Sequence, residues 1–231
     1  MSAPQPRRPF LYDLHDKLGA TFTTFAGWQM PLHYGGSGSD RAGGAAAEHH
    51  AVRNSTGLFD ISHMGRILVR GSNAGRWLAS MLSADIARLA VGLSTYALLC
   101  RDNGGVIDDV FVYRLSTQEY LVVVNAARRE RDIQWFTDHL PEESATALDA
   151  DGAAGASTDG PTGTSPDGTT EVALTLDDIS NTTVMLALQG PMAQAVLKQA
   201  GGMFYSGGAV QNHALARLPR FGVTQIGGAG S

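Results

Sequence analysis

Residues 94–115, STYALLCRDNGGVIDDVFVYRL, contain the pattern that decides the fold. Two runs, 94–100 and 106–115, are rich in the β-branched and aromatic residues that favour strands. The tetrad DNGG at 102–105 separates them, and Asn and Gly accept positive φ at little cost, so the tetrad is a strong turn signal. The stretch therefore predicts an antiparallel hairpin.

Around this hairpin, strands and helices alternate irregularly, with Gly-rich turns between neighbouring strands. Residues 144–171 have no aromatic or basic side chain and few apolar ones beyond Ala, which predicts a disordered surface insertion. The whole pattern favours an α+β fold with mostly antiparallel sheets and flanking helices. Apolar periodicity predicts helices at 11–19, 48–53, 73–82, 127–140 and 192–200, and further strands at 58–62, 66–71, 120–125, 172–176 and 182–188.

The composition excludes several classes of protein. The 231 residues are 43% hydrophobic, enough for one large or two small domains. A net charge of -5 without a dominant basic cluster argues against a nucleic-acid partner. Cys100 is the only cysteine, which excludes an internal disulfide and a multi-cysteine metal site. No apolar run approaches the roughly 20 residues of a membrane span. We expect a cytoplasmic protein, with the mitochondrial matrix as the alternative.

Asp108 and Asp109 interrupt an otherwise apolar strand just after the turn. Strand alternation sends the two carboxylates to opposite faces, so one reaches solvent and the other points inward. A buried carboxylate is costly unless it is hydrogen-bonded or paired, and proteins often use such a group for proton transfer or for binding a donor-bearing ligand. The alternative is local: one of the two carboxylates caps backbone amides of the hairpin.

Several tyrosines and histidines are further candidates for a functional role. Tyr96 and Tyr113 lie on strands near the aspartates, where they could stack on a flat heterocycle or serve as core residues with a wet tip. His49 and His50 are adjacent, so a helix would point them about 100° apart, and we expect exposed histidines and no metal site. His63 could line a cleft or simply pack. No phosphate loop, dinucleotide fingerprint or serine nucleophile motif is present.

Five blocks, in order, resemble the aminomethyltransferase family, the T-proteins of the glycine cleavage system. The resemblance runs from about residue 11 to about residue 223. Its blocks are LYDLHDKLGATFTTFAGWQMPLHY (11–34), EHHAVRNSTGLFDISHMG (48–65), residues 94–115, YLVVVNAARRERDIQW (120–135) and MLALQGPMAQAVL (185–197).

The resemblance implies a chemistry and a set of residues. Members accept an aminomethyl group from the lipoyl arm of the H-protein, release ammonia and pass the one-carbon unit to tetrahydrofolate, without a metal. The family's key carboxylate matches Asp109, which makes Asp109 the inward aspartate, holding the pterin side near N10 and assisting ionisation at the transferring carbon. Positions matching folate contacts are Met64, Tyr96, Tyr113, Val123 and Asn125.

The resemblance also predicts the domain organisation. Residues 1–60 with 172–231 would form a discontinuous, incomplete folate-binding domain, residues 61–143 a second α+β domain, and 144–171 the insertion. The family's RTGYTGEDG motif and its C-terminal domain have no counterpart here, so we expect a truncated chain, whose own activity stays open. The alternatives are a non-catalytic folate-binding relative and the folate module of a sarcosine or dimethylglycine oxidising enzyme.

Overall fold

The computed structural model describes residues 5–35, 43–141, 145–147, 162–164 and 170–201. These residues form two compact units. Unit 1 contains the chain up to His63 and the segment from Val184, and unit 2 contains Met64–Thr183. Each unit is described by itself.

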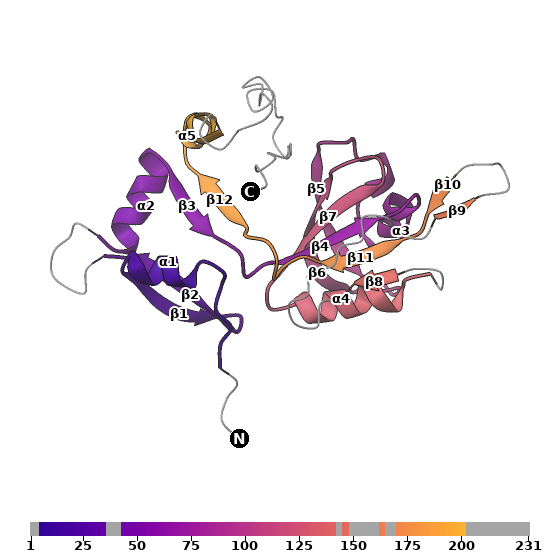
Figure 1. Ribbon diagram of the computed structural model, residues 1–231, viewed down its shortest axis with the longest axis horizontal. Coiled ribbons are helices and arrows are strands. Elements are labelled where there is room, and N and C mark those ends of the chain that lie inside the picture. The colour runs from indigo at the N-terminus through magenta and orange to yellow at the C-terminus, as the bar shows by residue number, and fades with distance from the viewer. Residues whose placement is uncertain (1–4, 36–42, 142–144, 148–161, 165–169, 202–231) are drawn as a thin grey trace. The chain divides into compact units, whose positions relative to one another are not determined.

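The elements follow the α+β pattern that the sequence predicts (Figure 1). The helices are α1 (Tyr12–Lys17), α2 (Ala45–Asn54), α3 (Ala74–Met81), the short 3-10 helix η1 (Ile86–Arg88), α4 (Arg129–Asp138) and α5 (Ala193–Gly201). The strands are β1 (Ala20–Phe25), β2 (Trp28–Tyr34), β3 (Gly57–Asp60), β4 (Gly65–Arg70), β5 (Ser94–Cys100), β6 (Val106–Arg114), β7 (Glu119–Val124), β8 (Ala145–Ala147), β9 (Thr162–Thr164), β10 (Thr170–Val172), β11 (Thr175–Asp178) and β12 (Leu186–Gln189).

Unit 2 is built on a six-stranded sheet in the order β5-β6-β7-β4-β11-β8. All neighbours are antiparallel except β11 and β8. The predicted hairpin forms β5 and β6, and Gly104 adopts φ 79° in its turn, where a side chain would be strained. The prediction of an α+β fold with mostly antiparallel sheets is confirmed.

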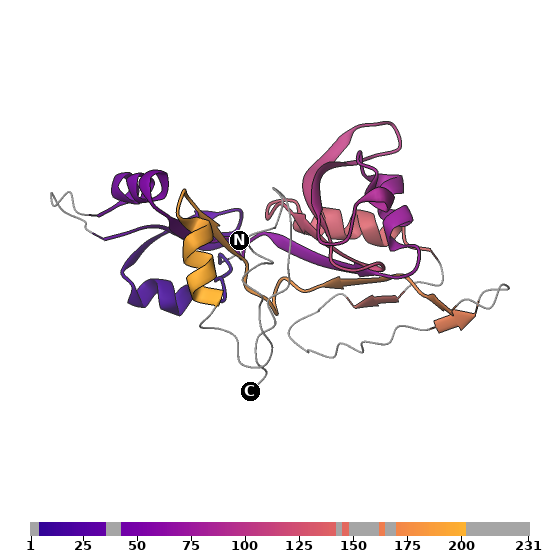
Figure 2. The same ribbon diagram turned by 90° about the horizontal axis from the view of Figure 1, so that it is seen from above.

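One face of this sheet carries the core of unit 2. Alternate residues of the central strands, such as Val112 and Val122, are fully buried there. Leu78 of α3 and Phe136 of α4 belong to the same apolar cluster, so both helices cover this face (Figure 2). Trp77 packs against Phe136 with ring centroids 5.7 Å apart. We call this side of the sheet the core face.

Unit 1 contains two separate two-stranded sheets, β1-β2 and β12-β3. A buried polar network ties its elements together. The Tyr34 hydroxyl oxygen lies 2.6 Å from Nδ1 of His15, and Nε2 of His15 lies 2.8 Å from a carboxylate oxygen of Asp60. These contacts link α1, β2 and β3. Among the described helices of the chain, none combines the length and the apolar character that a bilayer crossing requires.

The predicted domain boundary at residue 172 is wrong, because β11 belongs to unit 2 and not to unit 1. The domain prediction assigns residues 172–183 to the first domain, but Thr175–Asp178 pair with β4 inside the large sheet. The insertion prediction also fails in part, since Ala145–Ala147 form β8 alongside β11. Its remaining residues, apart from β9 and β10, and residues 202–231 lie outside the described ranges.

Candidate functional site

The register of β5, β6 and β7 places four predicted site residues on one face of the sheet. Tyr96 pairs with Phe111, and Phe111 pairs with Val123. Side chains two residues apart on a strand point the same way, so Asp109 and Tyr113 share this face with Phe111. The intervening valines point into the core. We call this side of the sheet, opposite the core face, the site face.

Three aromatic rings form a row on the site face. Tyr96 and Phe111 meet edge to face with centroids 5.4 Å apart, and Phe111 stacks with Tyr113 at 6.3 Å. Tyr96 is 52% exposed, whereas Phe111 and Tyr113 are half-buried. Burial raises the pKa of the Tyr113 hydroxyl above its usual value. An aromatic row with one exposed end suits stacking against a flat heterocycle. Sequence reasoning did not single out Phe111.

The structure corrects the expected orientation of the two aspartates. Asp108 is the inward residue, 7% exposed on the core face, and Asp109 is exposed on the site face. A hydrogen bond between Asp109 and the Tyr96 hydroxyl, ahead of burial and nearby negative charge, raises the pKa of Tyr96. Asp109 therefore stands beside the aromatic row, and the identification of Asp109 as the buried carboxylate is wrong.

Asn125, directly after β7, connects the two aspartates. Its backbone N–H donates to Oδ2 of Asp108 at 3.0 Å, and its Nδ2 donates to Oδ1 of Asp108 at 2.9 Å. The same Nδ2 lies 3.1 Å from Oδ1 of Asp109 and 3.1 Å from the Asp109 carbonyl oxygen. Asp108 thus accepts a backbone N–H, but this amide follows β7 and does not belong to the hairpin, so the local alternative is wrong about which amide is capped.

A third carboxyl group, Asp132 on α4, lies behind this arrangement. Its residue is 0% exposed. Burial, followed by the hydrogen bond and the charge of Asp108, raises the pKa of Asp132 to about 8, although Arg128 and Arg131 act to lower it. Sequence reasoning missed Asp132. The available signal was helical spacing, because Asp132 lies four residues before Phe136 and so shares its buried face.

Two predicted folate contacts occupy less accessible places. Val123 is on the site face but only 5% exposed, so it lies beneath the neighbouring side chains and offers little surface to a ligand. Met64 immediately precedes β4, whose first residue Gly65 pairs with Val124, and this register puts Met64 at the same end of the sheet as Asn125. The Met64 carbonyl accepts a hydrogen bond from Arg66 at 2.6 Å.

The histidines do not assemble a metal site in the described part of the chain. His49 and His50 are exposed on α2, as expected. His63 packs edge to face against Phe25 at 5.5 Å. No group of three or more potential ligand residues capable of holding a metal occurs among the described residues.

The site face therefore offers a defined chemistry. An exposed carboxylate, held by the Asn125 amide, can accept N–H donors from a heterocycle stacked on the neighbouring rings. A fixed anion also stabilises positive charge that develops nearby during a reaction.

Comparison with known proteins identifies the class to which this fold and this site belong. The chain belongs to the family described as the GCVT N-terminal domain, whose model matches residues 11–210. Among curated relatives, the chain is 36% identical to the aminomethyltransferase of Shouchella clausii, over 81% of this chain and 41% of that protein. It is 50% identical to the aminomethyltransferase of Saccharopolyspora erythraea, over 53% of this chain and 31% of that protein.

A solved structure agrees with these relatives. The glycine cleavage system aminomethyltransferase T from Bartonella henselae superimposes with a TM-score of 0.63 at 33% identity, covering 84% of this chain and 44% of that one. The chain thus spans about two fifths of the length of the relatives that it matches over most of its own length.

Proposed function

We propose that this chain takes part in aminomethyl transfer in the glycine cleavage system. The one-carbon unit of an aminomethyl group on the lipoyl arm of the H-protein would pass to tetrahydrofolate, with release of ammonia. The observation that carries the proposal is the exposed Asp109 carboxylate beside an aromatic row, in a chain of the GCVT N-terminal domain family.

The residues of the site face fit a reduced folate. A pterin is flat and carries several N–H donors, which match the exposed Tyr96 ring and the carboxylate next to it. Tyr113 and Phe111 extend the stacking surface. Asn125 holds the Asp109 carboxylate by a hydrogen bond of 3.1 Å, so little rotamer freedom is left to lose when a ligand binds.

Within this proposal the chain's own residues bind and stabilise charge. Tetrahydrofolate supplies the amine nitrogen that takes up the one-carbon unit. Asp109 accepts a hydrogen bond from the ligand and stabilises positive charge at the transferring carbon through its own negative charge. Asn125 holds Asp109 in place, because its Nδ2 donates a hydrogen bond to the carboxylate, and the interaction of Asp109 with the Tyr96 hydroxyl raises the pKa of Tyr96.

The relatives also bear on the alternatives. The proteins matched above are named aminomethyltransferases, which favours the transferase over an oxidising enzyme or a non-catalytic folate-binding protein. They are bacterial proteins, which favours the bacterial cytoplasm over a mitochondrial matrix. The lipoylated H-protein remains the proposed partner.

The test is calorimetric titration of the whole chain with tetrahydrofolate. The wild type should bind, and Asp109→Asn should weaken binding by about 10- to 100-fold, because a hydrogen bond to a charged group contributes about 1.5–3 kcal/mol. Asp102→Asn is the matched control, since Asp102 is an exposed aspartate in the turn of the same hairpin. It should leave the affinity unchanged.

Two outcomes would refute the proposal. One is the absence of wild-type binding at high micromolar tetrahydrofolate. The other is an Asp109→Asn variant that keeps both its folate affinity and its transfer rate from aminomethyl-loaded H-protein, which would remove Asp109 from the site.

A further inference from the structure

Asp132 is a buried acid that the proposed function does not use. It lies on α4 with 0% exposure. Neither of its side-chain oxygens finds a hydrogen-bond donor among the described residues when it is treated as ionised. An ionised carboxylate buried without a donor costs several kcal/mol. The neutral, protonated acid avoids that cost and can donate a hydrogen bond itself.

Asp108 is the acceptor that this proton needs. Asp108 lies on the core face, which α4 covers, and its hydrogen bond and charge both raise the pKa of Asp132. Both Asp108 oxygens already accept hydrogen bonds from Asn125, at 3.0 and 2.9 Å. An acceptor of two N–H groups is best left ionised, so the shared proton belongs on Asp132.

The contacts continue from Asp108 to the site face. Nδ2 of Asn125 donates to Oδ1 of Asp108 and, at 3.1 Å, to Oδ1 and the carbonyl oxygen of Asp109. Two N–H hydrogens thus serve three acceptors, and the direction of the amide determines where Asp109 points. The amide keeps this direction only while Asp108 stays fixed.

We propose that Asp132 is a positioning residue, which in its neutral form donates a hydrogen bond to Asp108 and so holds the Asn125 amide that orients the Asp109 carboxylate. The consequence for folate rests on the proposed function. The series of hydrogen bonds from Asp132 to Asp109 does not rest on the proposed function, and all of its residues lie in unit 2.

A capping role for Asp132 does not account for the geometry. Aspartate near a helix N-terminus usually accepts backbone N–H bonds or favours the helix dipole as an anion. The Asp132 oxygens accept no such bond. The other charged groups that act on Asp132, Arg128 and Arg131, are exposed on the same helix and leave the acid neutral at pH 7.

The experiment compares the whole wild-type chain with Asp132→Asn and Asp132→Leu. Asn can still donate to Asp108 but cannot ionise, whereas Leu has the same branching and number of side-chain heavy atoms and cannot donate. Carboxyl-carbon NMR of aspartate-labelled protein should show one group titrating near pH 8 in the wild type and none there in either variant. The side-chain amide signals of Asn125 should move with the same midpoint in the wild type, stay constant in Asp132→Asn, and shift at every pH in Asp132→Leu.

Folate binding supplies the functional arm. Wild-type affinity should fall about tenfold as the pH rises through 8, since ionisation of Asp132 repels Asp108, and Asp132→Asn should abolish this dependence. An Asp132 that titrates below pH 5, or Asn125 signals that are the same in Asp132→Leu and Asp132→Asn, would overturn the inference. The NMR titration decides the inference about Asp132 even if the chain binds no folate. Failure of the inference can therefore be distinguished from failure of the proposed function. If the leucine variant does not fold, the wild type and Asp132→Asn still decide through the titration and its loss.

Discussion

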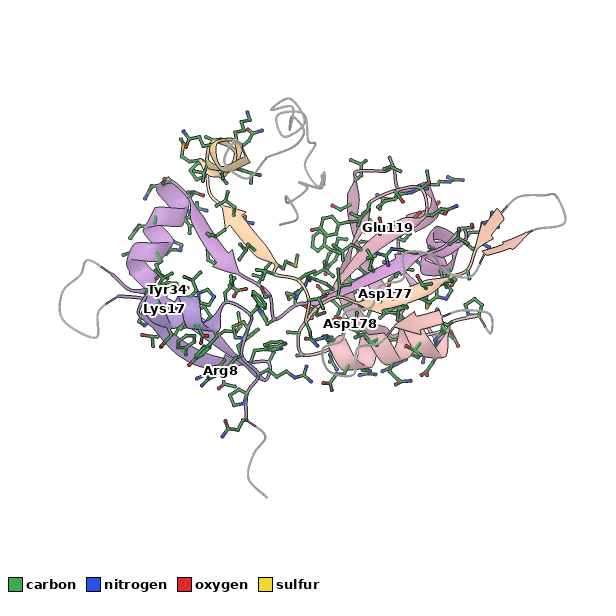
Figure 3. All side chains as sticks on the ribbon, in the orientation of Figure 1. Arg8, Lys17, Tyr34, Glu119, Asp177 and Asp178 are labelled. Carbon is green, nitrogen blue, oxygen red and sulfur yellow. The ribbon has the colours of Figure 1, made fainter. Side chains whose placement is uncertain are left out.

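Two neighbouring aspartates on β11 provide a stringent test of how unit 2 is held together. Asp177 and Asp178 are neighbours on β11 (Figure 3), and strand alternation points them to opposite faces. Each pairs with an arginine. Asp178 pairs with Arg129 of α4 at 3.0 and 2.5 Å, and both side chains are buried. Asp177 pairs with Arg70 at 2.5 Å, where the arginine side chain is 35% exposed. We expect Asp178→Asn to destabilise unit 2 strongly and Asp177→Asn to do so weakly.

The expected magnitudes follow from this burial. Removing one partner of a buried ion pair leaves an uncompensated charge and costs about 3–5 kcal/mol. In Asp178→Asn that charge is Arg129, whose other side-chain contact, with Asn181, is long at 3.5 Å. A partly exposed pair contributes about 1 kcal/mol or less, because solvent screens it. The difference between the two variants should therefore be at least about 2 kcal/mol.

Urea unfolding, followed by tryptophan fluorescence, measures this difference. Trp77 and Trp135 lie in unit 2, and a Trp28→Phe background removes the only tryptophan of unit 1. Added salt should weaken the contribution of Asp177 but not that of Asp178, since buried charges are little screened. A loss in Asp178→Asn no greater than in Asp177→Asn would refute the reasoning, since it would mean that the Arg129 pair is not desolvated.

Two further predictions concern the site face and unit 1. Tyr96→Phe should weaken tetrahydrofolate binding about three- to tenfold by calorimetry, because it removes the hydroxyl that interacts with Asp109. Burial alone would raise the pKa of Asp60, but hydrogen bonds from Ser62 and His15 hold it below its usual value. The resulting stability is present above the unfolded-state value of 3.8 and is lost as the pH falls through the lower folded value. Asp60→Asn should abolish this acid dependence in thermal unfolding below about pH 4.

Local signals in the sequence predicted the central hairpin well. The predicted strands at 94–100 and 106–115 correspond to Ser94–Cys100 and Val106–Arg114. Turn chemistry explains this success, because it acts within a few residues: Oδ1 of Asn103 accepts the N–H of Gly105 at 3.0 Å. The helix predicted at 127–140 is likewise present as α4.

Long-range packing determines the two features that the sequence did not predict, which are the buried face of β6 and the position of β11. Alternation along β6 places Asp108 and Asp109 on opposite faces, but α4 determines which face is buried, and α4 lies 20 residues further along the chain. Strand β11 is similar, since its position beside β4 depends on pairing across more than 100 residues. No local pattern reveals such a neighbour, so the second domain boundary was misplaced.

The correction at the two aspartates strengthens the case for Asp109 as the ligand-facing group. A buried carboxylate cannot meet a ligand without moving, whereas an exposed one that is unsupported would sample several rotamers and pay entropy on binding. The observed arrangement avoids both problems. Asp109 is exposed, and its orientation depends on Asn125, which Asp108 holds from the core side. The Asn125 amide is thus anchored by Asp108 in the core and holds the carboxylate of the adjacent residue, Asp109, at the surface. This coupling also means that Asp108→Asn should disturb folate binding without touching the ligand.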